Sequence, residues 1–552
     1  MHSGTGRWMA GKKGWLSKGA ACVLVGALVL TMKAHAATDT PPGGPLAMGG
    51  VAEGVLARMT ARAHPLDAQP GDLVRGSLGG DRMRLVLVNA AGQRERVLAT
   101  GVGNPQDFVF VAGANPPYAL EVRAPVEGGY SLRVSEVVPR AAQVPPPHVL
   151  ESLRLRALQQ ALVSGGADTE AFWTEMRERG TPLVEPDAHP APDGSVLVTF
   201  LWRGAQRNAW VFGAPSGNHD AMARLEGSDV WYRSYRVPPD TRLGYKLAPD
   251  VPELNAPAPV RRRAIVATAQ RDPLNARSFP ARPIDIFAGE SVLELPQAPA
   301  QEWVAAREGV AQGVVARHRV SSTVLGNTRN VTLYRPVGWQ PDAAGNALLV
   351  VFDGDAYQNE IPTPTILDNL IAAGELPPTA AILISNPSRK ARNEELPPNP
   401  AFMRFLATEL MPWARSQGVA ADADRTVVAG ASYGGLAAAY AGLQHPEWFG
   451  NVYSQSGSFW WSAEGQEPSW LTREFVRQPL RPVRFYLEAG LFEGNRAEQV
   501  GILESTRHLR DVLRAKGYAV HHREYAAGHD YLHWRGTLAT GLMALLGKTA
   551  TR

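Results

Sequence analysis

A serine flanked by glycines is the clearest reactive group in the sequence. Ser432 lies in the run Gly-Ala-Ser-Tyr-Gly at residues 430–434, after the apolar residues 426–429 and before the helix-forming residues 436–441. This order predicts a short buried strand, a sharp turn and a helix. The G-x-S-x-G spacing allows a turn tight enough to expose the serine hydroxyl above the sheet edge. Ser432 is therefore the candidate nucleophile, although a serine that only caps a helix fits the same pattern.

A serine nucleophile needs a base, and His529 follows it by 97 residues, in Ala-Ala-Gly-His-Asp-Tyr-Leu-His. α/β-Hydrolases place the acid and then the histidine after the serine, with the histidine in a loop between a strand and a final helix. Gly528 beside His529 permits an open loop in which the imidazole can reach the nucleophile. His533, four residues on, is the rival, and we interpret it as a helix-surface or supporting residue.

Two carboxylates follow the strand expected at residues 483–487, and either can orient the histidine. Glu493 lies in the loop beyond the strand and has the better reach toward the histidine Nδ1, so we favour it as the acid. Glu488 lies nearer the strand end and is the alternative acid. A serine-histidine dyad without an essential acid is a third possibility, since the acid only fixes the tautomer and stabilises the imidazolium.

The oxyanion hole of such a site needs two backbone N–H groups. We expect one from Tyr433, the residue after the nucleophile. The other is expected from Gly354 or Asp355, in the loop after the buried run at residues 347–352. An ordinary Asp-Gly turn is the alternative interpretation of that loop.

The first 36 residues have the features of a cleaved signal peptide. Four basic residues (Arg7, Lys12, Lys13 and Lys18) precede an apolar stretch at residues 19–32 and an Ala-His-Ala cleavage signal at residues 34–36. The sequence thus predicts export to the periplasm or beyond and no stable membrane span after cleavage.

Export also changes how the net charge is interpreted. The formal charge of +4 includes five basic and no acidic residues before the cleavage point, so the mature chain has 51 basic and 52 acidic side chains, a formal charge of −1. Net charge therefore gives no support for nucleic-acid binding. The single cysteine, Cys22, also precedes the cleavage point, so we expect neither a disulfide nor a cysteine-bound metal.

At 552 residues the chain is long enough for three to four domains. Changes in hydrophobic period predict a linker at 37–62, a jelly-roll-like β-sandwich at 63–145, a second β-sandwich at 150–290 and a catalytic domain at 300–552. In the last region strands alternate with helices, which predicts an α/β-hydrolase with a mainly parallel sheet covered on both faces. The first sandwich resembles the bacterial pre-peptidase-type modules attached to secreted enzymes.

Several motifs give the chain a more specific resemblance. The block around Ser432, the run His-Pro-Glu-Trp-Phe-Gly at residues 445–450 with Ser-Gln-Ser-Gly-Ser at 454–458, and Gly-His-Asp at 528–530 resemble the enterochelin (enterobactin) esterases within the esterase D-like α/β-hydrolases. Residues 230–243 and the run Asp-Pro-Leu-Asn at 272–275 resemble that family's N-terminal domain. The similarity extends over residues 150–547.

The resemblance implies hydrolysis of the serine esters in a cyclic tri-catecholate siderophore, free or ferric, with Ser432 as nucleophile and His529 as base. A ferric tri-catecholate is a trianion with aromatic faces, so guanidinium and indole groups are expected to line its binding site. The candidates are Arg389, Arg392, Trp460 and Trp461, although a solvated basic loop and two core tryptophans are the alternative. We expect no metal or organic cofactor. A general carboxylesterase or acyltransferase, or a non-catalytic siderophore-binding protein, remains the alternative function.

Overall fold

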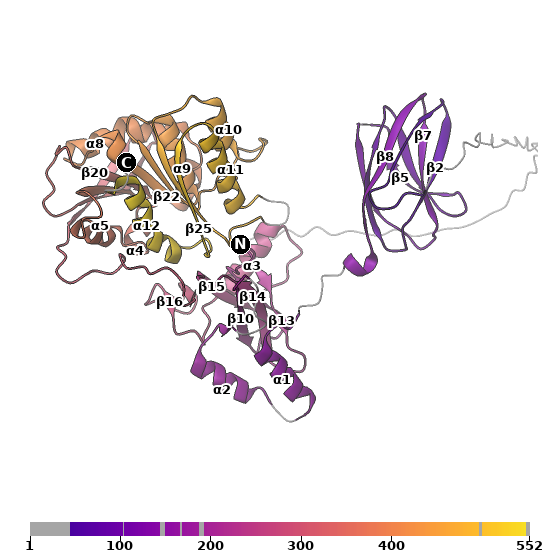
Figure 1. The fold of residues 1–552 in the computed structure, drawn as a ribbon, viewed down its shortest axis with the longest axis horizontal. Helices are drawn as coiled ribbons and strands as arrows, with labels where there is room; N and C mark the ends of the chain where they lie inside the picture. The colour runs from indigo at the N-terminus through magenta and orange to yellow at the C-terminus, as the bar shows by residue number, and fades with distance from the viewer. Residues whose placement is uncertain are drawn as a thin grey trace, which may run out of the picture. The chain divides into compact units, whose positions relative to one another are not determined.

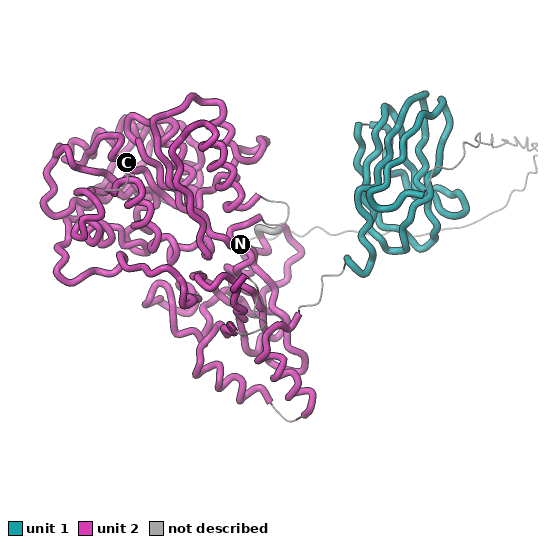
Figure 2. Tube along the Cα trace, in the orientation of Figure 1, with its two compact units in different colours: residues 1–147 teal, residues 148–552 magenta. Residues whose placement is uncertain are grey.

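The computed structural model describes residues 45–102, 104–143, 149–165, 168–186, 193–495 and 500–547. They form two compact units, one ending at residue 147 and the other beginning at residue 148 (Figure 2). The expected signal peptide at residues 1–36 lies outside the described residues. No helix in the described part of the chain is long and apolar enough to cross a membrane.

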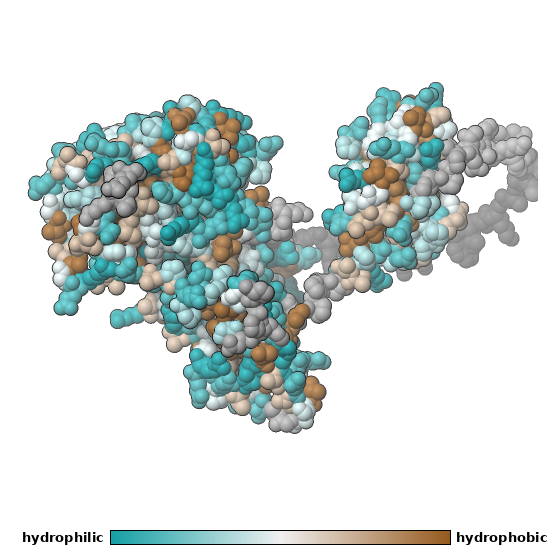
Figure 3. All heavy atoms as spheres, viewed as in Figure 1, coloured by the Kyte–Doolittle hydropathy of each residue, from teal (hydrophilic) through white to brown (hydrophobic). Residues whose placement is uncertain are grey.

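The first unit is a β-sandwich of two antiparallel four-stranded sheets, β1-β8-β3-β6 and β2-β7-β4-β5. Alternate residues of its strands point into one core, as in β6, where every second side chain is buried. Apolar and polar surface alternate over this unit in Figure 3. The strands are β1 (Val51–Leu56), β2 (Thr60–Leu66), β3 (Leu73–Gly79), β4 (Arg84–Val88), β5 (Arg94–Ala99), β6 (Gln106–Val111), β7 (Tyr118–Ala124) and β8 (Gly128–Val138), followed by the 3₁₀ turn η1 (Arg140–Gln143).

The sandwich begins earlier than the sequence indicated. The segment expected as the end of a linker, up to residue 62, contains β1 and the start of β2. β1 is an edge strand that buries few side chains, and among them only Leu56 is fully buried. Its alternation is therefore weak, and the sequence pattern indicates a linker there and not a strand.

The second unit opens with two helices and a second β-sandwich. Its sheets have the strand orders β13-β14-β10-β9 and β12-β11-β15-β17-β16. The elements are α1 (Leu153–Val163), α2 (Glu170–Arg179), β9 (Leu183–Glu185), β10 (Val196–Arg203), β11 (Ala209–Phe212), β12 (Asp220–Ala221), β13 (Ala223–Arg224), β14 (Val230–Val237), β15 (Arg242–Pro249), α3 (Ala258–Thr268), β16 (Ser278–Phe279) and β17 (Glu290–Glu294).

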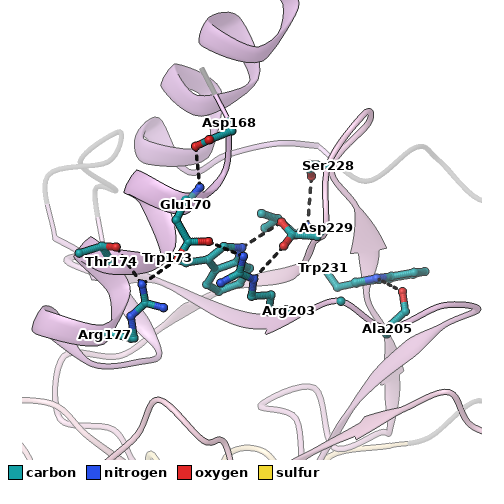
Figure 4. A network of polar contacts seen from close by, with 12 residues as sticks. Asp168, Glu170, Trp173, Thr174, Arg177, Arg203, Ala205, Ser228, Asp229 and Trp231 are labelled. Atoms are coloured by element: carbon teal, nitrogen blue, oxygen red, sulfur yellow. Dashed lines mark hydrogen bonds and ion pairs between the residues drawn. The ribbon is translucent and has the colours of Figure 1, made fainter. Parts of the chain in front are cut away.

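A polar network fixes α2 to one end of this sandwich, where β10 ends and β14 begins (Figure 4). The indole N–H of Trp173 donates to Asp229 at 2.9 Å, and the same carboxylate accepts from the Nε of Arg203 at 2.8 Å. Arg203 also donates to Glu170, which in turn accepts from Arg177. These aromatic and basic side chains therefore have a structural role in attaching α2.

The catalytic domain is built on one eight-stranded sheet with the order β18-β19-β21-β20-β22-β23-β24-β25 (Figure 1). β18 and β19 pair antiparallel, and the strands from β21 to β25 run parallel. The strands are β18 (Val314–Ser322), β19 (Asn327–Arg335), β20 (Ala347–Phe352), β21 (Thr379–Ile384), β22 (Thr426–Ala431), β23 (Asn451–Gln455), β24 (Arg484–Gly490) and β25 (Ala519–Tyr525).

Helices cover both faces of this sheet, so its central strands are buried on both sides and are continuously apolar in sequence. Side chains of α7 to α11 pack on one face, and those of α4, α5 and α12 on the other. The helices are α4 (Ala356–Asn359), α5 (Thr363–Ala372), α6 (Arg389–Glu395), α7 (Pro400–Phe405), the π-helical turn η2 (Leu406–Leu410), α8 (Met411–Ser416), the 3₁₀ turn η3 (Ala423–Arg425), α9 (Tyr433–Gln444), α10 (Trp470–Arg477), α11 (Ile502–Ala515) and α12 (Tyr531–Leu546).

Candidate active site

Ser432 occupies the sharp turn between β22 and α9. Its backbone has φ 60° and ψ −120°, a conformation that residues with a side chain rarely adopt and that is typical of a nucleophile elbow. The turn closes so tightly that a Cβ on Gly430 would lie 2.6 Å from the carbonyl carbon of Gly434. The Ser432 N–H donates to the carbonyl of Gln455, and its own carbonyl accepts from the N–H of Ser458. The serine is thus held rigidly at the carboxyl edge of the sheet.

His529 and Glu493 form the histidine-acid pair of the site. The Nδ1 of His529 lies 2.5 Å from Oε1 of Glu493, whose side chain is almost fully buried. The other carboxylate oxygen accepts from the N–H of Gly490 at 2.6 Å and from the hydroxyl of Ser456 at 2.7 Å. Since the carboxylate is fixed from three sides, it holds the proton of His529 on Nδ1 and leaves Nε2 to act as base.

Glu488 does not contact the histidine. It lies within β24, fully buried, and accepts hydrogen bonds from Gln455, Thr537 and Tyr453. Burial raises the pKa of Glu488 to about 7, even though these donors favour the charged form. Between the two candidate acids, the geometry therefore favours Glu493 and gives Glu488 a structural role.

The second sandwich holds the histidine loop in place. The N–H of Arg242 in β15 donates to the carbonyl of Ala526, and the N–H of Gly244 donates to Asp530 at 3.2 Å. Asp530 also caps α12 by accepting from the N–H of His533 at 2.7 Å. Of the two expected roles for His533, helix-surface or supporting residue, the structure agrees with the second: the side chain is buried, and burial lowers its pKa to about 3. It therefore stays neutral and supports the loop from within.

One of the expected oxyanion-hole donors is already engaged. The N–H of Gly354 donates to the carbonyl of Ile384 at 2.9 Å, so it is not available to a substrate oxygen, which corrects the expectation for this residue. The carboxylate of Asp355 accepts from the hydroxyl of Ser385 at 2.8 Å. Tyr433 begins α9, so its N–H has no acceptor within the helix. Tyr433 is thus the expected donor whose position best fits the role.

Two cavities open onto the serine and the histidine. The first has a volume of about 730 Å³ and the second about 510 Å³, and Ser432 and His529 line both. The first is enclosed by the catalytic domain on one side, including Trp460, and by the second sandwich on the other. Its sandwich wall consists of Phe212, Gly213, Ala214, Gly217, Asn218, His219, Leu243, Gly244, Arg262 and Glu290.

The other predicted substrate-binding residues have different positions. Arg392 lines the second cavity, but its guanidinium binds Asp353 with two hydrogen bonds of 2.6 and 2.8 Å and therefore neutralises that carboxylate. Trp461 packs edge-on against Trp470 in the core. Arg389 is exposed at the start of α6 and is not among the lining residues of either cavity. Of these candidates, only Trp460 and Arg392 lie at the site.

Several residues of the site were not singled out from the sequence. Ser456, in the left-handed region with φ 50°, connects the indole N–H of Trp534 to Glu493. The run Ser-Gln-Ser-Gly-Ser at residues 454–458, which includes the end of β23 and the turn after it, was a detectable signal for it, since polar residues at the carboxyl end of a buried parallel strand gather at the active edge. Arg262 gave no such signal, because it lies far from the triad in sequence and in another domain.

The arrangement fits acyl transfer through a covalent intermediate. In that chemistry Ser432 would attack an ester carbonyl while Nε2 of His529 takes the hydroxyl proton, and the carbonyl oxygen would become an oxyanion near the start of α9. The imidazolium then protonates the leaving alkoxide, and water releases the acyl group by the reverse proton path. The described hydrogen bonds pair the Ser432 hydroxyl with that of Ser458, at 3.4 Å, and not with the histidine.

Comparison with known proteins gives consistent results for both domains of the second unit. The family model for the N-terminal domain of enterochelin esterase matches residues 197–304, and the Esterase family model matches residues 322–545. The chain is 35% identical to the iron(III) enterobactin esterase of Dickeya dadantii (strain 3937) over an alignment 430 residues long, which covers 70% of this chain and 94% of that protein. It is 30% identical to the iron(III) salmochelin esterase of Escherichia coli O6:H1 over an alignment 417 residues long, which covers 71% of this chain and 98% of the relative.

A solved structure shows the same architecture. The crystal structure of the enterobactin esterase from Shigella flexneri in the presence of enterobactin has a TM-score of 0.54 and 30% identity, covering 68% of this chain and 97% of that one. The chain therefore spans nearly the whole length of each relative. The two family models match the sandwich and the catalytic domain of the second unit, including Ser432, Glu493 and His529. The chain is an esterase and belongs to the enterobactin (enterochelin) esterase family.

Proposed function

We propose that this protein hydrolyses the serine ester bonds of a catecholate siderophore trilactone such as enterobactin, in its free or ferric form, for iron acquisition. The observation that carries the proposal is the Ser432, His529 and Glu493 constellation at the floor of a cavity of about 730 Å³. The second sandwich forms the opposite wall of that cavity, in the region matched by the enterochelin esterase N-terminal family model.

The cavity suits a large ester with several arms better than a small acyl ester. It adjoins a second cavity at the nucleophile, since Ser432 and His529 line both. Its walls combine aromatic and hydroxyl groups, among them Phe212, Trp460 and Ser462. Aromatic faces suit catechol rings, and convergent polar groups suit the ester and amide groups between them.

The test is product chromatography with purified protein and its Ser432→Ala variant. Each is incubated with a cyclic tri-catecholate in iron-free and in ferric form. Linear trimer, dimer or monomer formed by the wild type alone establishes the reaction, and comparison of the two forms identifies the preferred iron state. Intact substrate in every sample, together with turnover of simple acyl esters, would favour a general carboxylesterase or acyltransferase. Tight binding with no product in either protein would favour a binding protein.

We further propose that the reaction takes place after export, in the periplasm or outside the cell. The support is the basic and apolar pattern of residues 1–36, with the Ala-His-Ala signal at its end. Cell fractionation and intact-mass measurement test this proposal. A mature protein that starts at Ala37 in the periplasmic or secreted fraction is expected, and a full-length protein in the cytoplasmic fraction would refute it.

A further inference from the structure

One wall of the first cavity carries a cation that the catalytic chemistry does not use. Arg262 lies on α3, which packs on β11 and β15 (Figure 1). It is the one Lys or Arg among the described residues that line this cavity. Its Nε donates to Nε2 of His219 at 3.2 Å. Within the described part of the chain, no carboxylate forms an ion pair with it.

The surroundings of Arg262 hold its planar group in a defined orientation. The ring of His219 stacks on that of Phe212, with centroids 4.2 Å apart and planes 14° apart. The guanidinium carbon of Arg262 lies 5.7 Å from the centroid of Phe212. Because one nitrogen is bound to His219 and the aromatic stack limits tilting, the remaining N–H groups are left to bind oxygens in the cavity.

The acidic residues that line this cavity repel a bound anion less strongly than three fully ionised carboxylates would. Glu493 is fixed by its three hydrogen bonds. Burial and the neighbouring Asp530 raise the pKa of Glu290, and burial raises the pKa of Asp530. These two groups therefore hold a proton more readily than free carboxyl groups do, which reduces the negative charge in the cavity.

We propose that Arg262, supported by the Phe212 and His219 stack, binds the paired oxygens of one catecholate arm of the substrate and so helps to select catecholate esters. The inference rests on the proposed function, since it names the part of that substrate which the second sandwich recognises. Two adjacent catecholate oxygens match the two-pronged donor geometry of a guanidinium, and a catechol ring can stack beside the aromatic pair. Arg262 is a binding residue in this account and takes no part in proton transfer.

Binding is measured in the Ser432→Ala background, so that turnover does not consume the ligand. The probe is the ferric cyclic tri-catecholate, followed by quenching of tryptophan fluorescence. Adding Arg262→Ala is expected to raise Kd by about ten- to a hundredfold, the usual loss for a charge-assisted pair of hydrogen bonds. Arg262→Lys is expected to give an intermediate Kd, because lysine keeps the positive charge but lacks the two parallel N–H donors of the guanidinium.

The neighbouring residues Arg261 and Arg263 are matched controls. Both are exposed on the same helix, about 100° around its axis from Arg262, and neither lines the cavity. Their alanine variants are expected to leave Kd within about twofold, which separates a local contact from general attraction by surface charge. Thermal melting of each variant checks that the fold is retained.

The outcomes distinguish this inference from the function on which it rests. If the otherwise wild-type enzyme cleaves the substrate while Arg262→Ala leaves Kd unchanged, the inference is wrong and the function stands. An equal increase of Kd in all three arginine-to-alanine variants would also overturn the inference, because it would show general attraction by positive surface charge and no local contact. The cyclic substrate has no carboxylate, so weakening confined to linear products would show carboxylate binding instead. If the protein neither binds nor cleaves the tri-catecholate, both proposals fall.

Discussion

Replacing Glu493 by glutamine tests the assignment of the triad acid, because the structure fixes which way the new amide must face. The N–H of Gly490 is a backbone donor that lies 2.6 Å from Oε2, so the amide oxygen must occupy that position. The amide NH₂ then occupies the position of Oε1, 2.5 Å from Nδ1 of His529. Facing a donor, the imidazole must accept at Nδ1 and carry its proton on Nε2. In that tautomer it cannot take the proton of Ser432.

The expected fall in kcat follows from the loss of both the productive histidine tautomer and the negative charge beside it. Where the acid of a serine triad is made neutral in this way, kcat falls on the order of 10³- to 10⁴-fold. That corresponds to about 4 to 5 kcal/mol of transition-state stabilisation. Since the change leaves the cavity walls intact, we expect KM to change by less than about threefold. Steady-state kinetics on the cyclic tri-catecholate, with thermal melting as a check on folding, measures these quantities.

Glu488→Gln is the matched control. An amide oxygen in the place of Oε1 still accepts from Gln455 and Thr537. The Tyr453 hydroxyl, which lies within reach of both Glu488 and the carbonyl of Thr537, can donate to that carbonyl at 2.8 Å and accept from the new NH₂. We expect kcat within about threefold of wild type. A large loss in Glu488→Gln with a small one in Glu493→Gln would refute the reasoning and make Glu488 the acid. Small losses in both would indicate a serine-histidine dyad.

Three further predictions concern groups around the triad. Glu488 keeps its proton up to about pH 7 in the folded protein but only up to about pH 4.5 in the unfolded chain. As the pH rises between these values, the unfolded chain loses the proton before the folded protein does, and the free energy of unfolding falls. This contribution is about 3 kcal/mol, and urea denaturation across that range should show a smaller fall in Glu488→Gln; an unchanged slope would contradict it. Ser456→Ala removes a hydrogen bond to Glu493 and is expected to lower kcat about tenfold in steady-state assays; unchanged kcat would show that Gly490 alone holds the carboxylate. Arg392→Ala leaves Asp353 without its counter-charge and is expected to lower the free energy of unfolding by about 2 kcal/mol in urea, with a smaller loss in Arg392→Lys; equal stability of all three proteins would exclude a structural role for the pair.

The fold of the catalytic domain could be predicted because its local and tertiary signals agree. β20 and β22 are short apolar runs that the sheet buries on both faces, and each begins at its expected position. β1 was not predicted, because an edge strand buries too little to show a regular period. α3 was not predicted either, since its buried residues Ala264 and Ile265 cover only a small part of its surface.

The residues of the candidate site also differ in how well the sequence identifies them. Ser432 and His529 were identifiable because backbone geometry constrains the residues around them, above all the glycines of the elbow. The choice between Glu488 and Glu493 depended on where β24 ends, and strand ends are poorly defined by sequence. The engagement of the Gly354 N–H and the position of Arg262 on the cavity wall arise from contacts between segments far apart in the chain. No local pattern encodes such contacts.

The most direct test of the account is intact-protein mass spectrometry of samples quenched early in turnover of the cyclic tri-catecholate. When Ser432 opens a lactone, the leaving alkoxide stays attached to the acyl group, so the first acyl-enzyme carries the mass of one whole substrate. We predict that adduct on the peptide containing Ser432, and its absence in Ser432→Ala. An adduct on another residue, or product formation by Ser432→Ala at the wild-type rate, would contradict the central claim.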